Sequence, residues 1–256
     1  MRELLVQLRV IRALVLRETR TRFGQYRLGY VWALIEPLLW IATFGGMYLL
    51  LDRPAPNGLP LVAFLATGIV PFLLFRETSG RVVPAIDANK GLLFYPLVRP
   101  LDLVAARVLL EFATHMVVLG ILLSTLAVLQ GGVRIDNVLV LLTGLLLASG
   151  LGAGMGLVFC GLSVFTSSAE RVHGPLLRPL FWTSAIFFSS DTLPEPARSA
   201  LLYNPVLHAV ELVRDGWFAG YHPRDISMAY PAVWVLVLLF LGLTLERVAR
   251  RRIQLT

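Results

Sequence analysis

The charged residues with the clearest chemical potential stand at the entrance of an apolar segment. Arg20, Arg22 and Arg27 precede this segment. Clustered guanidinium groups bind phosphates and carboxylates, so the three arginines are candidates to receive an anionic group. Glu36 lies a few residues inside the segment, directly before Pro37. A carboxylate facing lipid is costly, so we expect Glu36 to face protein, water or an arginine. With the helix-bending proline it forms either a structural kink or a gate for a transported molecule.

A second set of polar residues shares one face of a predicted helix. Arg107, Glu111 and His115 follow one another at a spacing of four residues. This spacing favours a structural pair between the arginine and the glutamate. A proton relay is the alternative, because an imidazole titrates near neutral pH.

Motifs of catalysis and of metal binding are absent from the sequence. It contains no G-x-x-x-x-G-K-[ST] phosphate loop, no H-E-x-x-H and no G-x-S-x-G. The four histidines are scattered, and Cys160 is the single cysteine, so neither a metal site nor a disulfide framework is expected. We therefore predict no catalytic residue, metal or cofactor in this chain. Uphill transport would draw its energy from a partner or from an ion gradient.

These residues must be positioned in a chain that is too apolar for a soluble domain. Of 256 residues, 57% are hydrophobic and 15% are charged, and the mean hydropathy is +0.74. Soluble domains carry about 25% charged residues. The net charge of +7 would by itself suggest a nucleic-acid partner, but the arginines flank apolar runs, as they do at membrane surfaces. The composition therefore predicts an all-α integral membrane protein with no nucleic-acid partner.

Six apolar runs approach the length of about 20 residues that a helix needs to cross a bilayer. They cover residues 29–51, 59–75, 101–129, 138–165, 175–190 and 230–246. An even number of spans places both termini on one side, and most of the 23 basic residues fall on that side. Because basic residues are retained in the cytoplasm, the pattern predicts cytoplasmic termini.

Residues 1–28 precede the predicted membrane domain, which covers residues 29–256. Leu4, Leu8, Ile11 and Val15 recur at helical spacing between arginines. This pattern indicates an amphipathic helix lying in the membrane surface. A helix packed on a partner is the alternative.

Two segments between the spans are unusual. Residues 76–100 join spans two and three and place apolar and aromatic side chains beside charges, which is typical of a surface where another chain docks. Residues 191–229 join spans five and six and predict two short helices split at Asn204 and Pro205. Such a pair indicates a re-entrant or interfacial helical hairpin, which protein or water must cover.

Three stretches carry a resemblance to a known family. They read LRETRTRFGQYRLGYVWALIEPLLW, FLATGIVPFLLFRETSGRVVPAIDANKGLLFYPLVRPLDLVAARVLLE and LLRPLFWTSAIFFSSDTLPEPARSALLYNPVLHAVELVRDGWFAGY. Together with their order and spacing, they make the chain resemble the polysaccharide-export permeases of ATP-binding-cassette exporters, the capsule-export branch in particular. The resemblance extends over nearly the whole chain, and O-antigen and teichoic-acid exporters share the architecture.

The resemblance implies a transport subunit rather than an enzyme, located in the bacterial inner membrane. It implies a homodimer bound to two cytoplasmic ATPase subunits, which hold ATP and Mg²⁺. The substrate would be a lipid-linked polysaccharide, received by a periplasmic polysaccharide co-polymerase and an outer-membrane export channel.

The resemblance also implies roles for particular residues. The segment between spans two and three would couple the chain to the ATPase through Asn89, Lys90, Leu92, Leu93, Phe94 and Tyr95. Aromatic channel-lining residues would be Trp40, Phe44, Tyr48 and Trp182. Substrate would enter past Arg20, Arg22 and Arg27, with Glu36 at the gate.

Other functions stay open on the sequence. The chain could export O-antigen, teichoic acid or a small drug. From a different class, it could be a membrane enzyme acting on lipid-linked glycans, with Glu111 and His115 as the nearest candidates for acid–base chemistry. A scaffold for glycan-synthesis enzymes is a third alternative.

Overall fold

The computed structural model describes residues 2–23, 29–129, 135–166 and 168–253. Within these residues every regular element is a helix. The α-helices are α1 (Arg2–Phe23), α2 (Gly29–Leu50), α3 (Leu61–Val82), α4 (Pro100–Leu129), α5 (Val138–Ser163), α6 (Ser168–Thr183), α7 (Glu195–Leu201), α8 (Pro205–Trp217) and α9 (Ala229–Ile253). Three short 3₁₀ helices are η1 (Pro56–Gly58), η2 (Asp87–Phe94) and η3 (Ser190–Thr192). The boundary expected at residue 28 lies outside the described residues.

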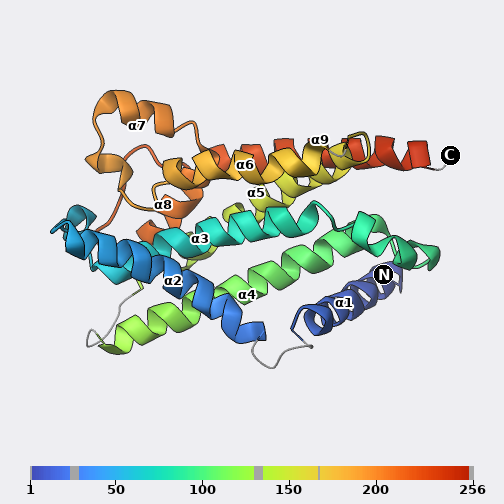
Figure 1. The fold of residues 1–256 in the computed structure, drawn as a ribbon, viewed down its shortest axis with the longest axis horizontal. Coiled ribbons are helices and arrows are strands. Elements are labelled where there is room, and N and C mark those ends of the chain that lie inside the picture. Colours follow the sequence, from blue (N-terminus) through green and yellow to red (C-terminus); the bar gives the residue numbers. More distant parts are fainter. Residues whose placement is uncertain (1, 24–28, 130–134, 167, 254–256) are drawn as a thin grey trace.

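The long helices run side by side, and the chain reverses at each end of the bundle (Figure 1). The start of α1 and the end of α9 lie at the same end, whereas α7 and α8 lie at the opposite end (Figure 1). We call these the terminal end and the hairpin end. The prediction of an all-α membrane protein is confirmed.

Five described helices are long and apolar enough to cross a membrane, and they cover Val31–Leu50, Leu61–Val82, Pro100–Val128, Val138–Ser163 and Ala229–Ala249. The predicted fifth span is different. Its helix, α6, begins at Ser168 and ends at Thr183, and residues 184–189 are not helical. The helix therefore does not cover residues 175–190, although α6 does return the chain to the hairpin end (Figure 1).

Glycines let α5 occupy the centre of the bundle, between α3, α8 and α9. A Cβ atom on Gly152 would lie 2.5 Å from the Phe75 carbonyl oxygen of α3, and one on Gly154 would lie 2.7 Å from the Leu238 Cβ of α9. Both distances are too short for a real contact, so only glycine permits these approaches. Glycines recur at a spacing of four in this helix, a pattern that is typical of closely packed membrane helices.

The two short helices predicted near Asn204 and Pro205 are α7 and α8. The Asn204 side chain accepts a hydrogen bond from the Val206 N–H, 3.0 Å away, and so caps α8. Most of α8 is buried against α5 and α3.

Candidate functional site

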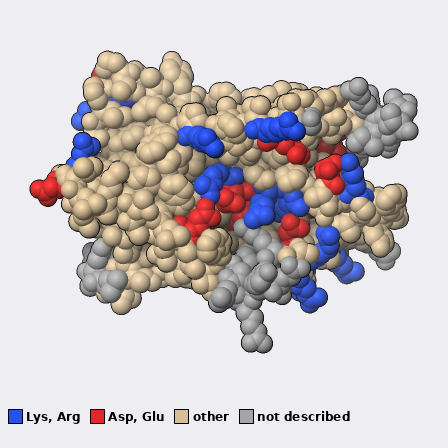
Figure 2. Space-filling view, viewed as in Figure 1, with Lys and Arg blue, Asp and Glu red and all other residues tan. Residues whose placement is uncertain are grey.

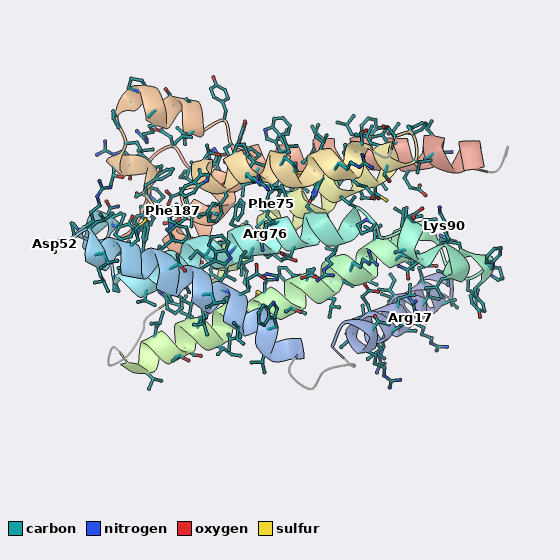
Figure 3. The ribbon with its side chains drawn as sticks, viewed as in Figure 1. Arg17, Asp52, Phe75, Arg76, Lys90 and Phe187 are labelled. Atoms are coloured by element: carbon teal, nitrogen blue, oxygen red, sulfur yellow. The ribbon has the colours of Figure 1, made fainter. Side chains whose placement is uncertain are left out.

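An ion pair joins α2 to α3 where the lone carboxylate was expected to need a partner. Arg76 contacts Glu36 of α2, and its Nη2 atom lies 2.9 Å from Oε1 of Glu77. The Glu36 and Arg76 side chains are 35% and 27% exposed, so the pair is half-buried. Arg76 lies near the middle of the bundle (Figure 3). The expectation that Glu36 faces protein, water or an arginine is confirmed, and Pro37 beside it is buried within the helix.

The predicted entrance arginines are only partly described. Arg20 is exposed near the end of α1. Arg27 and the side chain of Arg22 lie outside the described residues. Of these three residues, the structure therefore places only the side chain of Arg20.

Helix α1 packs on the chain itself. Leu14 is buried against Leu103 and Ala106 of α4. Glu18 pairs with Arg107 of α4 at 3.0 Å, and polar contacts also join Gln7 to Asp102 and Arg17 to Asn89. On the opposite side, Leu5, Leu8 and Leu16 stay exposed. The apolar side of α1 that contains Leu14 is therefore covered by α4. The other apolar side of α1, with the three exposed leucines, is not covered by any part of the described chain.

The predicted coupling residues divide into buried and exposed groups. Asn89 is buried and accepts a hydrogen bond from Arg17 Nη1 at 2.9 Å. Leu92 and Leu93 pack against the cluster of buried side chains formed by Leu14, Leu103 and Ala106, which we call the Leu14 cluster. Phe94 and Tyr95 are 89% and 63% exposed. Lys90 is also exposed and pairs with Asp87. The exposed side of this segment therefore presents two aromatic rings, whereas its buried residues attach it to α1.

Charged residues of α4 form pairs that cross to other helices. Glu111 Oε1 lies 3.6 Å from Arg81 Nε of α3, and Arg107 pairs with Glu18 of α1. His115 Nδ1 lies 2.9 Å from the Glu111 carbonyl oxygen within the same helix. The sequence predicted a pair between Arg107 and Glu111. The structure adds pairs of these two side chains with Glu18 of α1 and Arg81 of α3, and it places His115 Nδ1 3.9 Å from Glu111 Oε2 within α4. Their arrangement stabilises helix packing.

The four predicted channel aromatics lie together at the contact between α2 and α6. Trp40 stacks on Phe44 with ring centroids 5.6 Å apart, and Trp182 meets Phe44 edge-on at 6.3 Å. Tyr48 donates a hydrogen bond to the Phe187 carbonyl oxygen. Residues 184–189 and α6 add two rings to this set, Phe181 and Phe187. We call the six side chains Trp40, Phe44, Tyr48, Phe181, Trp182 and Phe187 the aromatic seam.

The sequence did not predict the buried charges at the hairpin end. Glu211 and Arg214 of α8 are fully buried and lie 3.7 Å apart. Arg214 donates hydrogen bonds to carbonyl oxygens of residues 184–189. The signal available in the sequence was a glutamate and an arginine three residues apart in a predicted helix with many apolar residues.

The profile of the ABC-2 type transporter family matches residues 9–218. The chain belongs to this family. The resemblance found in the sequence is thereby confirmed, and this ABC-2 transporter chain is a transport subunit rather than an enzyme.

Its relatives include named export proteins. Polysialic acid transport protein KpsM of Escherichia coli is 37% identical over 243 residues, which cover 94% of each chain. Capsule polysaccharide export inner-membrane protein CtrC of Neisseria meningitidis serogroup A is 32% identical over 94% of this chain and 91% of its own. O-antigen export system permease protein RfbA of Klebsiella pneumoniae is 23% identical over 80% of this chain and 78% of its own.

Charges on the ABC-2 transporter chain are unevenly distributed. On the face shown in Figure 2, basic and acidic side chains interleave in the middle and toward the terminal end, whereas the half near the hairpin end is mostly uncharged. Within the described residues, no group of three or more His, Cys, Asp or Glu side chains is placed to hold a metal ion.

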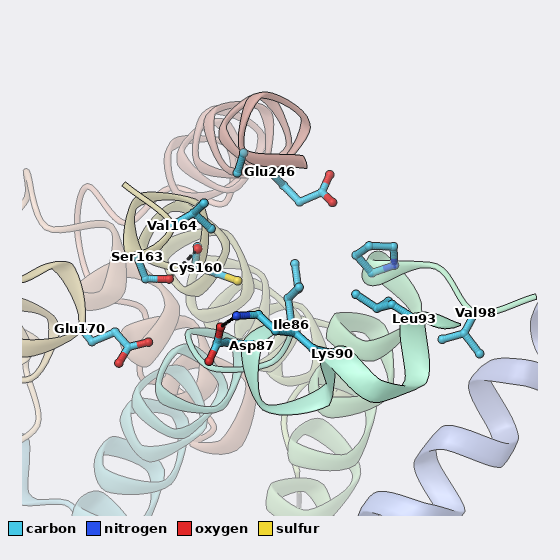
Figure 4. Close-up of a pocket in the computed structure, with 13 residues that line it drawn as sticks. Ile86, Asp87, Lys90, Leu93, Val98, Cys160, Ser163, Val164, Glu170 and Glu246 are labelled. Atoms are coloured by element: carbon cyan, nitrogen blue, oxygen red, sulfur yellow. Dashed lines mark hydrogen bonds and ion pairs between the residues drawn. The ribbon is translucent and has the colours of Figure 1, made fainter. Parts of the chain in front are cut away.

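A groove of about 700 Å³ opens at the terminal end of the ABC-2 transporter chain. It lies between η2, the start of α4, the end of α5, the start of α6 and the end of α9. Glu170 and Glu246 come from opposite sides, and the pair of Asp87 and Lys90 lies between them (Figure 4). Lys90 and Leu93 of the predicted coupling set line this groove.

Proposed function

We propose that this chain is the membrane subunit of an exporter that moves lipid-linked capsular polysaccharide across the bacterial inner membrane. The observation that carries the proposal is the similarity over nearly full length to proteins named for polysialic acid transport and capsule polysaccharide export. The five long apolar helices fit a subunit embedded in the membrane.

The energy for export comes from a separate ATPase subunit. The sequence has no phosphate-binding loop of its own. Two copies of the chain form a homodimer that binds two cytoplasmic ATPase subunits carrying ATP and Mg²⁺. A periplasmic polysaccharide co-polymerase and an outer-membrane channel receive the polymer. Both termini of the chain are cytoplasmic, which fits the common end of α1 and α9 (Figure 1).

The chain crosses the membrane six times, with α6 and the residues after it as the fifth crossing. Residues 1–28 form the interfacial segment, residues 29–256 form the transmembrane domain, and residues 191–229 form a re-entrant hairpin. The burial of α8 against α3 and α5 supports the hairpin, since its polar backbone is then covered by protein.

The ATPase docks on residues 76–100. The exposed rings of Phe94 and Tyr95 form the contact, and Lys90 adds a charge beside them. Asn89, Leu92 and Leu93 transmit the motion, because they bind the segment to α1. ATP-driven movement of the coupling segment therefore carries α1 with it, as a rigid-body transition.

Substrate enters at the arginines before α2. Arg20, Arg22 and Arg27 bind the anionic head of the lipid anchor. The pair of Glu36 and Arg76 closes the path behind them. The glycan then moves along the aromatic seam, since aromatic rings stack on sugar faces.

Reconstitution into vesicles tests the function. The chain and its ATPase would be combined with a labelled lipid-linked acidic glycan, and we expect ATP-dependent movement of the glycan across the vesicle membrane. The chain without the ATPase is the control. Movement of glycan by the chain alone, or none by the assembled complex, would contradict the proposal.

An O-antigen exporter is the second candidate, favoured by the similarity to RfbA. A lipid-linked O-antigen glycan in the same vesicles separates the two candidates. Transport of that glycan in preference to the acidic capsular one would decide for O-antigen export.

Substitution of the entrance arginines tests the entrance. Export should fall in the variant with Arg20→Gln, Arg22→Gln and Arg27→Gln, while the complex with the ATPase still assembles. A variant with Arg9→Gln and Arg12→Gln is the control, because both arginines are exposed on α1, the helix of Arg20, and lie further from the predicted entrance. Equal export by both variants would remove the entrance role.

A further inference from the structure

The end of α6 is held by a side chain from elsewhere in the chain. Helix α6 ends at Thr183, and Ala185 adopts the left-handed conformation with φ of 54°. The last carbonyl groups of a helix have no partner within it, so residues just beyond the end need other donors. We call residues 184–189 the shelf.

Arg214 of α8 supplies donors to the shelf. Its guanidinium donates to the carbonyl oxygens of Ala185, of Ile186 at 2.8 Å and of Phe188 at 3.2 Å. The same group lies 3.8 Å from the centroid of the Phe64 ring in α3. One side chain thus joins the shelf to both α8 and α3.

A buried carboxylate completes this attachment. Glu211 lies 3.7 Å from Arg214, and it accepts hydrogen bonds from the Ser190 N–H at 2.9 Å and from the Tyr221 hydroxyl at 2.6 Å. Both charged side chains are fully buried. Moving either side chain away would leave the other charge buried without a partner, which costs free energy. Glu211 and Arg214 therefore hold each other, and the residues that they bind, in place.

Helix α3 approaches this unit closely at Gly68. A Cβ atom there would collide with Arg214 Nη2 and would lie 3.0 Å from the Ile186 carbonyl oxygen. The absent side chain of Gly68 therefore leaves the space that the guanidinium occupies.

The attachment of α2 to the shelf is weaker. Tyr48 donates one hydrogen bond to the Phe187 carbonyl, and the Phe44 and Phe187 ring centroids lie 4.1 Å apart. The contacts between α2 and the shelf thus consist of one hydrogen bond and a ring contact. The contacts of the shelf with α3 and α8, by contrast, include several hydrogen bonds from the buried guanidinium of Arg214. The aromatic seam therefore has one firmly held side and one loosely held side.

The geometry points to Arg214 as a positioning residue for export: it fixes the shelf, and with it Phe187, as the stationary side of the aromatic seam while α2 moves. This inference rests on the proposed function, because it assigns the seam to the path of the glycan. Arg214 itself is buried and does not touch the substrate.

Two substitutions release the shelf in different ways. Arg214→Lys keeps the charge but lacks the planar set of donors that reaches several carbonyls. Gly68→Ala keeps Arg214 and displaces its guanidinium. Arg198→Lys is the matched control, because Arg198 is also a buried arginine near the hairpin end but pairs with Asp191, Glu195 and Asp225.

A thiol placed at the shelf reports its release. Ser184 is fully buried, and Ser184→Cys in a Cys160→Ala background gives a single cysteine. We expect Arg214→Lys and Gly68→Ala to raise its labelling rate with a maleimide about tenfold, since local opening controls access. In the vesicle assay with the ATPase, export should fall by about tenfold in both variants, since a small misplacement of positioning groups has effects of this size or larger. The Arg198→Lys control should leave labelling and export unchanged.

The outcomes separate the two proposals. Parent-like export or labelling in Arg214→Lys would overturn the positioning role. Failure of both variants to accumulate as a complex with the ATPase would also overturn it, because Arg214 would then act in folding alone. If the parent chain itself moves no glycan, the proposed function fails, while the labelling rates still test the attachment of the shelf.

Discussion

Glu36 of α2 and Arg76 of α3 form an ion pair between the first two helices that are long and apolar enough to cross a membrane. The carboxylate stands directly before Pro37, where the helix lacks one backbone hydrogen bond. The pair thus binds α2 to α3 at the point where α2 can bend. Few residues of α2 are buried, Ile41 and Phe44 among them, so this ion pair adds a polar contact to a small apolar one.

Removing Arg76 should destabilise the protein more than removing the charge of Glu36. Arg76→Met leaves the Glu36 and Glu77 carboxylates without their shared cation, and we expect a cost of about 1–2 kcal/mol, with about half of that for Glu36→Gln. Thermal unfolding in detergent measures both. Lys90→Gln is the control, because its pair with Asp87 is well exposed and should contribute almost nothing. Equal midpoints for all three variants would contradict the structural role.

Gly152→Ala should disturb the contact between α5 and α3. The new methyl group would lie 2.5 Å from the Phe75 carbonyl oxygen, and overpacking of this kind costs about 1–3 kcal/mol. Gly46→Ala in α2 is the control, since no atom lies within 4 Å of the added carbon. That variant should be neutral or slightly more stable, because alanine is the better helix former. A lower melting temperature for Gly46→Ala than for Gly152→Ala would show that this packing is wrong.

The Phe94→Ser and Tyr95→Ser double variant should keep the stability of the parent chain. Both rings are exposed in the isolated chain, so no packing is lost there. Binding of the ATPase, measured by co-purification, should decrease by at least about tenfold, since buried aromatic side chains dominate binding energies. Leu93→Ser is the comparison: it should lower the melting temperature, because Leu93 packs against the Leu14 cluster. Unaltered ATPase binding by the double variant would exclude these rings from the docking surface.

His222 should titrate above its ordinary range. A hydrogen bond from its imidazole to Asp215 at 2.7 Å, together with the charge of that carboxylate, raises the pKa of His222 above 6.5. Because the folded pKa is the higher one, the pair stabilises the fold below pH 6.5, and this contribution is lost as the pH rises through the folded pKa. NMR titration of labelled histidine measures the pKa, and Asp215→Asn should return it toward 6.5. An unchanged pKa in that variant would rule out this pairing.

The apolar runs of the sequence determined most of the helices, because a span must bury or expose to lipid about 20 apolar residues whatever its neighbours are. The stretch from Arg20 to Trp40 also carried part of the family resemblance. The four aromatics predicted to line a channel lie close together, and the structure adds Phe181 of α6 and Phe187 of the turn after it.

Tertiary structure alone decided which charged residues meet. Glu36 pairs with Arg76, which is forty residues away in the sequence. Arg214 donates hydrogen bonds to the carbonyl oxygens of Ala185, Ile186 and Phe188. Local spacing could not show these partners: it did not predict the pair of Arg107 with Glu18, and it extended the fifth helical run beyond Thr183. The physical reason is that the partner of a buried charge depends on which helices pack together, and this is decided only in the tertiary structure. The spacing of apolar residues, by contrast, is a local property that can be read from the sequence of each helix.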